Sequence, residues 1–194
     1  MPITIEFTGV PNSGKTSLLR NLRKLFENSD LKVAIIQESA ELLPKSIPKG
    51  SLEQNMWINL ETMQRCLELK YYTDVDFILL DRGIFNQMFW TRMYKKNSSY
   101  ASYADQLMRN FESMFQCVPD YIYVVDCKVD EAIKRRMASG EPITFSNKQF
   151  LEDYQREFKE FLCSIDNEKI RYIDTTHLNQ NQVANAVYEE VIRM

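Results

Sequence analysis

The sequence predicts an α/β fold of the P-loop kinase type, with a five-stranded parallel sheet and helices on both of its faces. Short runs rich in β-branched and aromatic residues alternate with segments whose apolar residues recur every three or four positions. Such alternation is typical of parallel strands joined by helical crossovers. The 194 residues show no break in composition, so we expect residues 1–194 to form a single domain.

The strands are expected where short apolar runs occur, and the helices where apolar stripes lie between them. The strand segments are Ile3–Thr8, Lys32–Ile36, Phe77–Asp81, Tyr121–Asp126 and Ile170–Asp174. The helical stripe Met56, Leu60, Met63 and Leu67 and the long stripe within Gln149–Ile165 are expected to face the core. Two stretches with proline and glycine, Glu41–Ser51 and Ala138–Lys148, are expected to be loops.

Composition excludes several classes of protein. The chain is 44% hydrophobic and 26% charged, which is ordinary for a globular protein, and no run reaches the roughly 20 apolar residues that span a bilayer. The first residues lack the pattern of a secretory signal, so we expect a cytoplasmic protein without a membrane partner. A net charge of −3 gives no general attraction to nucleic acid. The same net charge still allows a local basic pocket.

The cysteines and the histidine do not form a metal-binding pattern. Cys66, Cys117, Cys127 and Cys163 stand far apart without a CxxC pair, and His177 is the single histidine. We therefore expect reduced thiols that serve mostly for packing.

A phosphate-binding loop follows the first strand segment. Residues Gly9–Thr16 read GVPNSGKT and match the motif GxxxxGK[ST] in full, between a predicted strand and a predicted helix. The glycines allow successive backbone N–H groups to point inward, and the helix start adds further donors and its positive dipole end. A nucleoside triphosphate is expected to contact Gly9, Pro11, Asn12, Ser13, Gly14, Lys15, Thr16 and Ser17.

The motif also implies the cofactors ATP and Mg²⁺. Lys15 is expected to reach the β- and γ-phosphates, and the Thr16 hydroxyl is expected to bind Mg²⁺. A second, acidic ligand is expected at the end of a neighbouring strand. Asp81 and Asp126 both end apolar runs. We favour Asp81 because Arg82 follows it directly and places a cation at the carboxyl end of the strand, where open α/β sheets bind ligands.

Two further groups are candidates for the chemistry of transfer. Glu38 follows the second strand and could orient and deprotonate an attacking oxygen, or it could be a solvated loop residue. Arg135 and Arg136 precede a glycine-containing loop, so residues of about 135–148 could form a lid that neutralises phosphate charge and excludes water. A solvated helix face would explain the same charges.

The aromatic residues and one absent motif bear on the substrate. The guanine-reading motif NKxD is missing, because Phe150 follows Asn147-Lys148-Gln149, and this argues against a GTPase switch. The aromatic side chains that either stack on a base or pack in the core are Trp57, Phe85, Phe89, Trp90 and Tyr94.

The order of these elements resembles the P-loop nucleoside and nucleotide kinase superfamily, with its thymidylate kinases and deoxynucleoside kinases, over nearly the whole chain. The residues that carry the resemblance are Gly9–Thr16, Glu38, Asp81-Arg82, and Val124–Asp126 leading into Glu131–Arg136. It implies that Glu38 acts as a base, that Asp81 and Arg82 bind metal and acceptor, and that Arg135 and Arg136 grip phosphates. It also implies that His177 lies near the adenine.

The acceptor implied by the resemblance is a nucleoside or a nucleoside monophosphate. Gln37 stands where thymidylate kinases are expected to have an arginine, and Ala138–Gly140 stand where nucleoside kinases carry a second lid arginine, for which Lys148 could substitute. The alternatives are a kinase acting on a nucleic-acid hydroxyl or another small metabolite, and a nucleotide-sensing ATPase module that works through a protein partner. The identity of the acceptor and the formation of a homodimer stay open.

Overall fold

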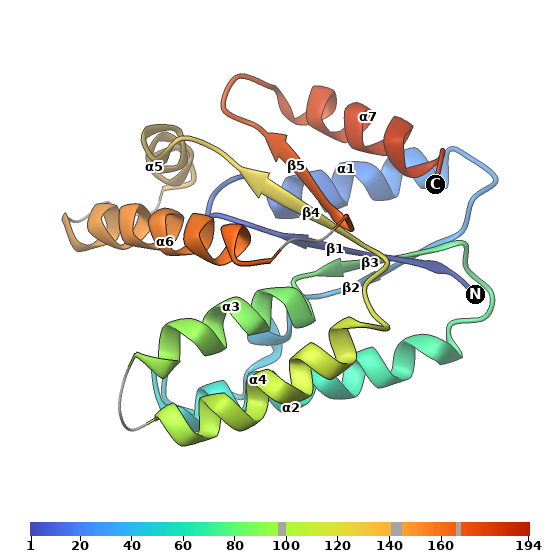
Figure 1. Cartoon of the computed structure of the whole chain (residues 1–194). Helices are drawn as coiled ribbons and strands as arrows, with labels where there is room; N and C mark the ends of the chain where they lie inside the picture. Colours follow the sequence, from blue (N-terminus) through green and yellow to red (C-terminus); the bar gives the residue numbers. More distant parts are fainter. Residues whose placement is uncertain (97–99, 141–144, 166–167) are drawn as a thin grey trace. The chain divides into compact units, whose positions relative to one another are not determined.

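The computed structural model describes residues 1–96, 100–140, 145–165 and 168–194, without the side chains of residues 145–147. Within these residues five strands form one sheet in the order β2-β3-β1-β4-β5 (Figure 1). Strand β2 pairs in parallel with β3, from Val33 opposite Phe77 to Ile36 opposite Leu80. The strands are β1 (Ile3–Thr8), β2 (Val33–Ile36), β3 (Phe77–Asp81), β4 (Tyr121–Asp126) and β5 (Ile170–Asp174). The predicted five-stranded parallel sheet is therefore confirmed.

Seven α-helices and two short 3₁₀ turns are present in the described part of the chain. The α-helices are α1 (Lys15–Glu27), α2 (Leu52–Glu68), α3 (Ile84–Lys95), α4 (Ala101–Phe115), α5 (Val129–Ala138), α6 (Phe145–Cys163) and α7 (Gln180–Val191). The 3₁₀ turns are η1 (Ser39–Leu42) and η2 (Leu69–Tyr71). Serine and asparagine caps start two of the helices: Ser51 accepts a hydrogen bond from the backbone of Gln54, and Asn179 forms a capping box with Gln182.

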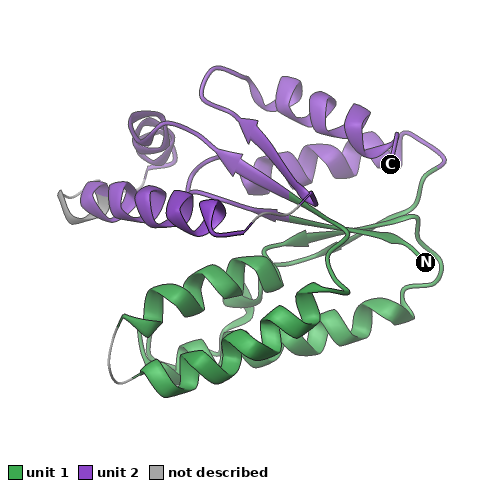
Figure 2. Ribbon diagram, in the orientation of Figure 1, with its two compact units in different colours: residues 1–6, 31–122 green, residues 7–30, 123–194 purple. Residues whose placement is uncertain are grey.

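The chain forms two compact units, shown in different colours in Figure 2. Unit 1 comprises Met1–Glu6 and Leu31–Ile122, and unit 2 comprises Phe7–Asp30 and Tyr123–Met194. In unit 1, α3 packs along α4 and also contacts α2. In unit 2, α1 packs along α7, and α5 contacts α6. Strands β1 and β4 contribute residues to both units, and the single domain expected from the sequence stays a prediction.

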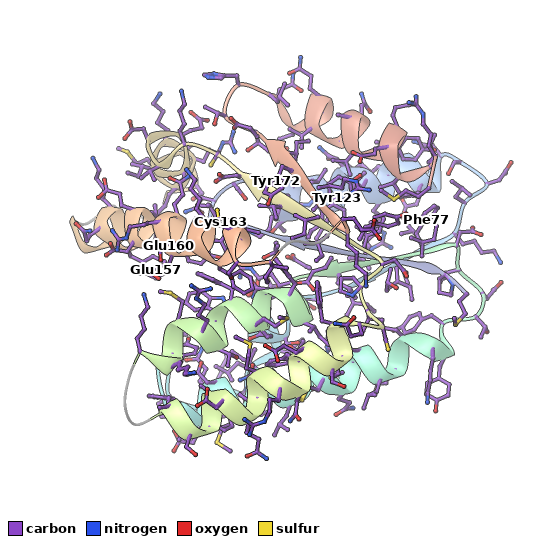
Figure 3. All side chains as sticks on the ribbon, viewed as in Figure 1. Phe77, Tyr123, Glu157, Glu160, Cys163 and Tyr172 are labelled. Carbon is purple, nitrogen blue, oxygen red and sulfur yellow. The ribbon has the colours of Figure 1, made fainter. Side chains whose placement is uncertain are left out.

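Each unit has its own buried core. Strand β3, which begins at Phe77 (Figure 3), is buried along its whole length in unit 1. In unit 2, Phe7 of β1 stacks on Tyr123 of β4, with ring centroids 5.4 Å apart. Strands β3 and β4 read as apolar runs because central strands of a parallel sheet are covered on both faces, whereas β1 alternates apolar residues with buried polar ones.

Several boundaries differ from the predictions. Strand β2 begins at Val33, one residue later than expected, and α6 begins at Phe145, four residues earlier. The predicted loop Ala138–Lys148 therefore contains the start of a helix, and its residues 141–144 lie outside the described part of the chain. The start of α6 carries serine and asparagine, which are typical of loops and so concealed the boundary. A helix nevertheless accepts them, because each costs only a fraction of a kcal/mol.

The inward face of α2 was predicted wrongly. Met56, Leu60 and Leu67 are exposed by 39%, 62% and 63%. The buried face of α2 carries polar as well as apolar residues: Asn55, Ile58, Asn59, Thr62 and Cys66. The helical period separates the two faces of a helix but does not tell which of them faces the interior. In α2 the face with two asparagines and a threonine is the buried one.

Two other expectations can be compared with the structure. All four cysteines are free of disulfides, but only Cys66 and Cys127 are buried, so the packing role holds for half of them. None of the helices in the described residues combines the length and the apolar character needed to cross a membrane.

Candidate active site

The phosphate loop occupies the turn between β1 and α1 in unit 2. Gly9 has a φ of 129°, and a Cβ on it would lie 2.1 Å from the carbonyl oxygen of Val125 in β4, so that only glycine fits. Gly14 forms the N-cap of α1 with a φ of 97°. No side chain caps this helix, and its first turn contains no acidic residue. The backbone donors at the start of α1 are thus suited to an external anion.

Lys15 is directed toward its own loop. Its side chain is 6% exposed, and the ammonium group donates to the carbonyl oxygens of Gly9 at 3.2 Å and Val10 at 3.1 Å. The Ser13 hydroxyl is buried and has no hydrogen-bond partner among the described residues. A buried cation and an unused hydroxyl beside backbone donors are the groups that a polyphosphate needs, so the cradle fits the expected nucleotide.

The remaining predicted cradle residues border this turn. Pro11, Asn12 and Ser17 are partly exposed, whereas Thr16 is exposed. Asn12 has a φ of 63°, a conformation that asparagine tolerates better than most residues. An exposed hydroxyl at Thr16, in the first turn of α1, suits a metal ion carried in with the nucleotide.

Arg135 of α5 joins the phosphate loop. Its guanidinium donates to the carbonyl oxygen of Ser13 at 3.0 Å, to the hydroxyl of Thr175 at 2.9 Å and to the carbonyl oxygen of Thr175 at 2.6 Å. Glu131, one turn earlier on α5, accepts from its Nε at 3.0 Å. These bonds exclude the interpretation of Arg135 as part of a solvated helix face. Arg136 is half-buried next to it in the sequence.

Two loop contacts were not foreseen from the sequence. The Thr175 hydroxyl donates to the carbonyl oxygen of Ser13 at 2.8 Å, and the phenol of Tyr154 in α6 donates to the carbonyl oxygen of Gly9 at 3.3 Å. The position of Thr175, directly after the last strand, was the available signal. Tyr154 belongs to the apolar stripe of α6 and carries no signal that separates it from the core.

Three polar residues lie at or after the carboxyl ends of β4 and β5, namely Asp126, Asp174 and His177. His177 is exposed on the loop after β5. At the end of β5, Asp174 accepts from the backbone N–H of Thr176 at 2.8 Å, and hydrogen bonds from Thr176 hold the pKa of Asp174 below its usual range. Asp126 uses Oδ1 to accept from the backbone of Cys127 at 2.8 Å and from Gln155 at 3.2 Å. This carboxylate oxygen therefore already holds the turn that leads into α5.

In unit 1, Glu38 and Arg82 form an ion pair after β2 and β3. The Glu38 carboxylate accepts from the Arg82 guanidinium, and the side chains are only 17% and 18% exposed. The parallel register explains the meeting, because Ile36 lies opposite Leu80 and the two partners follow these residues at equal distance. Glu38 is therefore not a solvated loop residue. Asp81, at the end of β3, is 7% exposed.

The aromatic residues of α3 divide into core and surface. Phe85 and Phe89 are fully buried and belong to the core of unit 1. Trp90 and Tyr94 are partly exposed and stack with centroids 5.8 Å apart, and Tyr94 stacks in turn on Tyr100 at 6.0 Å. Trp57 of α2 is also partly exposed. Of the predicted rings, Trp57, Trp90 and Tyr94 can therefore still meet a base, and Tyr100 stacks beside Tyr94.

The buried polar face of α2 lies near this row of rings. The Thr62 hydroxyl donates to Ser39 of η1 at 3.1 Å, and Asn55 is buried on the same face of α2. Burial raises the pKa of Tyr94, and Asn55 beside it acts in the opposite direction. Neutral donors and acceptors at this place can read the edge of an uncharged ring.

Unit 2 also contains a cavity of about 680 Å³ between the start of α5, α6 and β5. Lys148 lines it and lies 3.8 Å from Glu152, so it is a surface residue of α6 rather than a neighbour of Arg135 in the contacts described. Tyr172 of β5, labelled in Figure 3, is 65% exposed at the same cavity. The other lining residues include acidic, basic and neutral side chains and favour no single ligand.

No group of three or more His, Cys, Asp or Glu side chains within the described ranges gathers as a metal-binding cluster. The metal ligands expected here are instead a hydroxyl and one carboxylate, together with the phosphates of a nucleotide.

Comparison with known proteins agrees with this geometry. A family model described as thymidylate kinase matches residues 7–187. None of the curated proteins compared with the chain matches it significantly. Among solved structures, a thymidylate kinase from Candida albicans, reported to reveal the origin of broad substrate specificity and a novel structural element, superposes with a TM-score of 0.65. It is 17% identical, and the match covers 99% of this chain and 92% of that one. The chain belongs to the thymidylate kinase family of phosphotransferases.

Proposed function

We propose that this protein transfers the γ-phosphoryl group of ATP to the phosphate of a nucleoside monophosphate, with thymidylate as the first candidate. The observation that carries the proposal is the half-buried pair of Glu38 and Arg82 after β2 and β3. A guanidinium held at the carboxyl ends of parallel strands is suited to grip a phosphate with two parallel hydrogen bonds. An acceptor that already carries a phosphate offers that group, whereas a nucleoside does not.

The donor nucleotide is proposed to occupy the phosphate loop. Its backbone donors and Lys15 would bind the β- and γ-phosphates, with Lys15 leaving the carbonyl oxygens of Gly9 and Val10 for the anion. Arg135, tied to the loop through Ser13, is proposed to neutralise phosphate charge. Arg136 is proposed as a second phosphate contact, and His177 is proposed to lie near the adenine.

Mg²⁺ is proposed to accompany ATP. The hydroxyl of Thr16 and the carboxylate of Asp81 are proposed as its ligands, because both are hard oxygen donors of the kind this ion prefers. When bound, the ion neutralises negative charge on the phosphates.

The charge state of the acceptor decides what Glu38 must do. A hydroxyl must lose a proton as it attacks, so a kinase acting on a nucleoside needs a base there. A phosphate oxygen is already anionic at neutral pH and needs none. With a monophosphate acceptor, Glu38 is proposed to orient Arg82 rather than to remove a proton.

The base of the acceptor is proposed to lie against the polar face of α2 and the exposed rings of α3. The buried side chain of Asn55 lies beside Tyr94 and offers an amide to the edge of a base, and the stack of Trp90 and Tyr94 offers a flat surface. These groups carry no charge and so suit a neutral base.

The assay that tests the function measures ADP formation from Mg-ATP with a panel of acceptors: deoxynucleoside and ribonucleoside monophosphates, the matching nucleosides and a short oligonucleotide. We expect turnover that depends on a monophosphate and is lost in Lys15→Ala. The matched control is Lys24→Ala, which changes an exposed lysine in the last turn of the same helix.

The panel also decides between the alternatives. Turnover with nucleosides or oligonucleotide alone would identify a hydroxyl kinase. Slow ADP formation that is independent of every acceptor would favour a nucleotide-sensing module.

A homodimer is proposed through the exposed stripe of α2. Met56, Leu60 and Leu67 recur at coiled-coil spacing on one face of the helix. If two copies of α2 crossed in antiparallel fashion about the middle of this stripe, Glu53 at the start of one helix would approach Lys70 of η2, just after the end of the other, so the charges would match. The cytoplasmic address expected from the sequence stays a prediction that cell fractionation can check.

A further inference from the structure

Glu6 is a buried acid to which the proposed function assigns no role. It lies on β1 in unit 1 with none of its surface exposed. Burial raises the pKa of Glu6 from 4.5 to about 7, although hydrogen bonds from three backbone N–H groups act in the opposite direction. Keeping an acid in a sheet interior is costly to stability, so its contacts indicate what it does there.

The contacts of Glu6 are with the first turn of α3. Its Oε2 accepts from the backbone N–H of Phe85 at 3.0 Å, and its Oε1 accepts from that of Asn86 at 2.8 Å. The backbone N–H of Gly83 is a third donor. Helix α3 has no capping side chain of its own, so a residue about 80 positions away in the chain supplies the cap.

This cap adjoins a strained turn. Arg82, the residue directly before Gly83, has a φ of 58°, in the left-handed region. For a residue other than glycine this conformation costs roughly 1–2 kcal/mol, and it persists only where the surroundings hold it. A Cβ on Gly83 would lie 2.7 Å from Oε2 of Glu6, so the carboxylate packs directly against the turn.

We propose that Glu6 is a positioning residue: by fixing the first turn of α3 it holds Arg82 in its left-handed conformation and so keeps the guanidinium against Glu38. Glu6 itself touches no substrate. The inference rests on the proposed function, since positioning matters only if Arg82 handles the acceptor. It goes beyond that function because it assigns a positioning role to Glu6, which packs against the turn at Arg82 and Gly83 without touching the substrate.

Few charged or titratable groups face Glu6 in the described part of the chain. In the described residues, the titratable group coupled to it is the Cys66 thiol of α2, whose pKa is raised to about 12 by burial and then by the charge of Glu6. The thiol therefore stays neutral at ordinary pH. The other facing charge is the positive end of the α3 dipole.

The experiment compares three variants in acceptor-dependent ADP formation. Glu6→Gln keeps the shape but turns an amide N–H₂ toward backbone donors, and Gly83→Ala pushes on the carboxylate without changing a charge. The control is Asp120→Asn, which alters another carboxylate bound to β1, where Asp120 accepts from the backbone and the hydroxyl of Thr4 at 2.8 Å each.

We expect Glu6→Gln and Gly83→Ala to lower kcat at least tenfold and to raise KM for the acceptor, with KM for ATP unchanged. Asp120→Asn should lower Tm but leave both constants within twofold. The wild-type kcat should rise with pH through about 7, and Glu6→Gln should lose this rise. If both variants keep kcat within twofold, or if they change KM for ATP and for the acceptor equally, the proposal is wrong.

Amide hydrogen exchange separates this inference from the proposed function and needs no activity. The amides of Phe85 and Asn86 should be protected in the wild type and exchange at least tenfold faster in Glu6→Gln and Gly83→Ala, but not in Asp120→Asn. If the wild type transfers no phosphoryl group, the proposed function fails, and equal exchange in all four proteins would then refute the positioning as well. If Glu6→Gln does not fold, Gly83→Ala decides alone.

Discussion

The guanidinium of Arg135 donates a hydrogen bond to the carbonyl oxygen of Ser13 at 3.0 Å, so that α5 is fastened to the phosphate loop. The same guanidinium binds Thr175, in the loop after β5. One side chain thus holds two backbone segments of unit 2. Its positive charge lies next to the phosphate loop.

Replacing Arg135 should affect the donor nucleotide. We expect Arg135→Ala to lower kcat/KM for ATP by at least tenfold, because it removes a cation beside the phosphates and frees the loop. Arg135→Lys should recover only part of the loss, since an ammonium group cannot make the forked contacts. Initial rates at varied ATP measure the effect. Arg156→Ala, on the exposed side of α6, serves as control, and equal rates in the control and in Arg135→Ala would contradict the prediction.

Glu38→Gln should distinguish the two classes of acceptor. With a nucleoside monophosphate we expect a loss of kcat of about tenfold, through poorer orientation of Arg82. With a hydroxyl acceptor the loss should reach about 10²–10⁴-fold, as for removal of a general base. Single-turnover rates with each acceptor measure the difference, and ATP affinity by calorimetry should not change. An unaltered rate with every acceptor would remove Glu38 from the site.

Much of the fold and part of the site could be predicted because they depend on local signals. The strands were placed almost to the residue, since β3 and β4 leave apolar runs between polar turns and the other strands are short stretches rich in β-branched or aromatic residues. The phosphate loop was found because its chemistry requires glycine, lysine and threonine at fixed spacing. Glu38 and Arg82 were each singled out because they come soon after a strand of a parallel sheet, but their ion pair was not predicted.

Other features could not be predicted because they depend on contacts between distant parts of the chain. The cap of α3 by Glu6 joins residues about 80 positions apart, and in the sequence Glu6 is an ordinary polar residue within a strand. The same holds for Tyr154, whose phenol reaches Gly9 from an apolar stripe. The buried polar face of α2 was missed because leucine and methionine on the opposite face gave the stronger apolar pattern.

The exposed stripe of α2 should control association. We expect the wild type to be a dimer by light scattering, and Leu60→Glu together with Leu67→Glu to shift it to monomer, because buried like charges replace apolar contacts. Met137→Glu is the matched control, since Met137 is as exposed as Leu60, at 62%, but lies on α5. A monomeric wild type, or a control that dissociates equally, would contradict the assignment.

The pH dependence of stability should carry the signature of Glu6. Because the pKa of Glu6 is raised from 4.5 to about 7 in the folded state, the native protein holds this proton more tightly than the unfolded chain. Its contribution to the free energy of unfolding is therefore fully present below about pH 4.5 and is lost as pH rises through about 7, a change of about 3 kcal/mol.

Glu6→Gln should abolish this contribution. The free energy of unfolding of the wild type minus that of Glu6→Gln should fall by about 3 kcal/mol between about pH 5 and pH 8, as measured by urea denaturation. Taking the difference removes the titration of the other carboxyl groups, and Asp120→Asn should follow the wild type over the same range. Parallel curves for wild type and Glu6→Gln would show that Glu6 does not titrate here. A variant that gains stability relative to wild type at alkaline pH while transferring phosphate more slowly would show that the buried acid is kept for the position of Arg82 and not for stability.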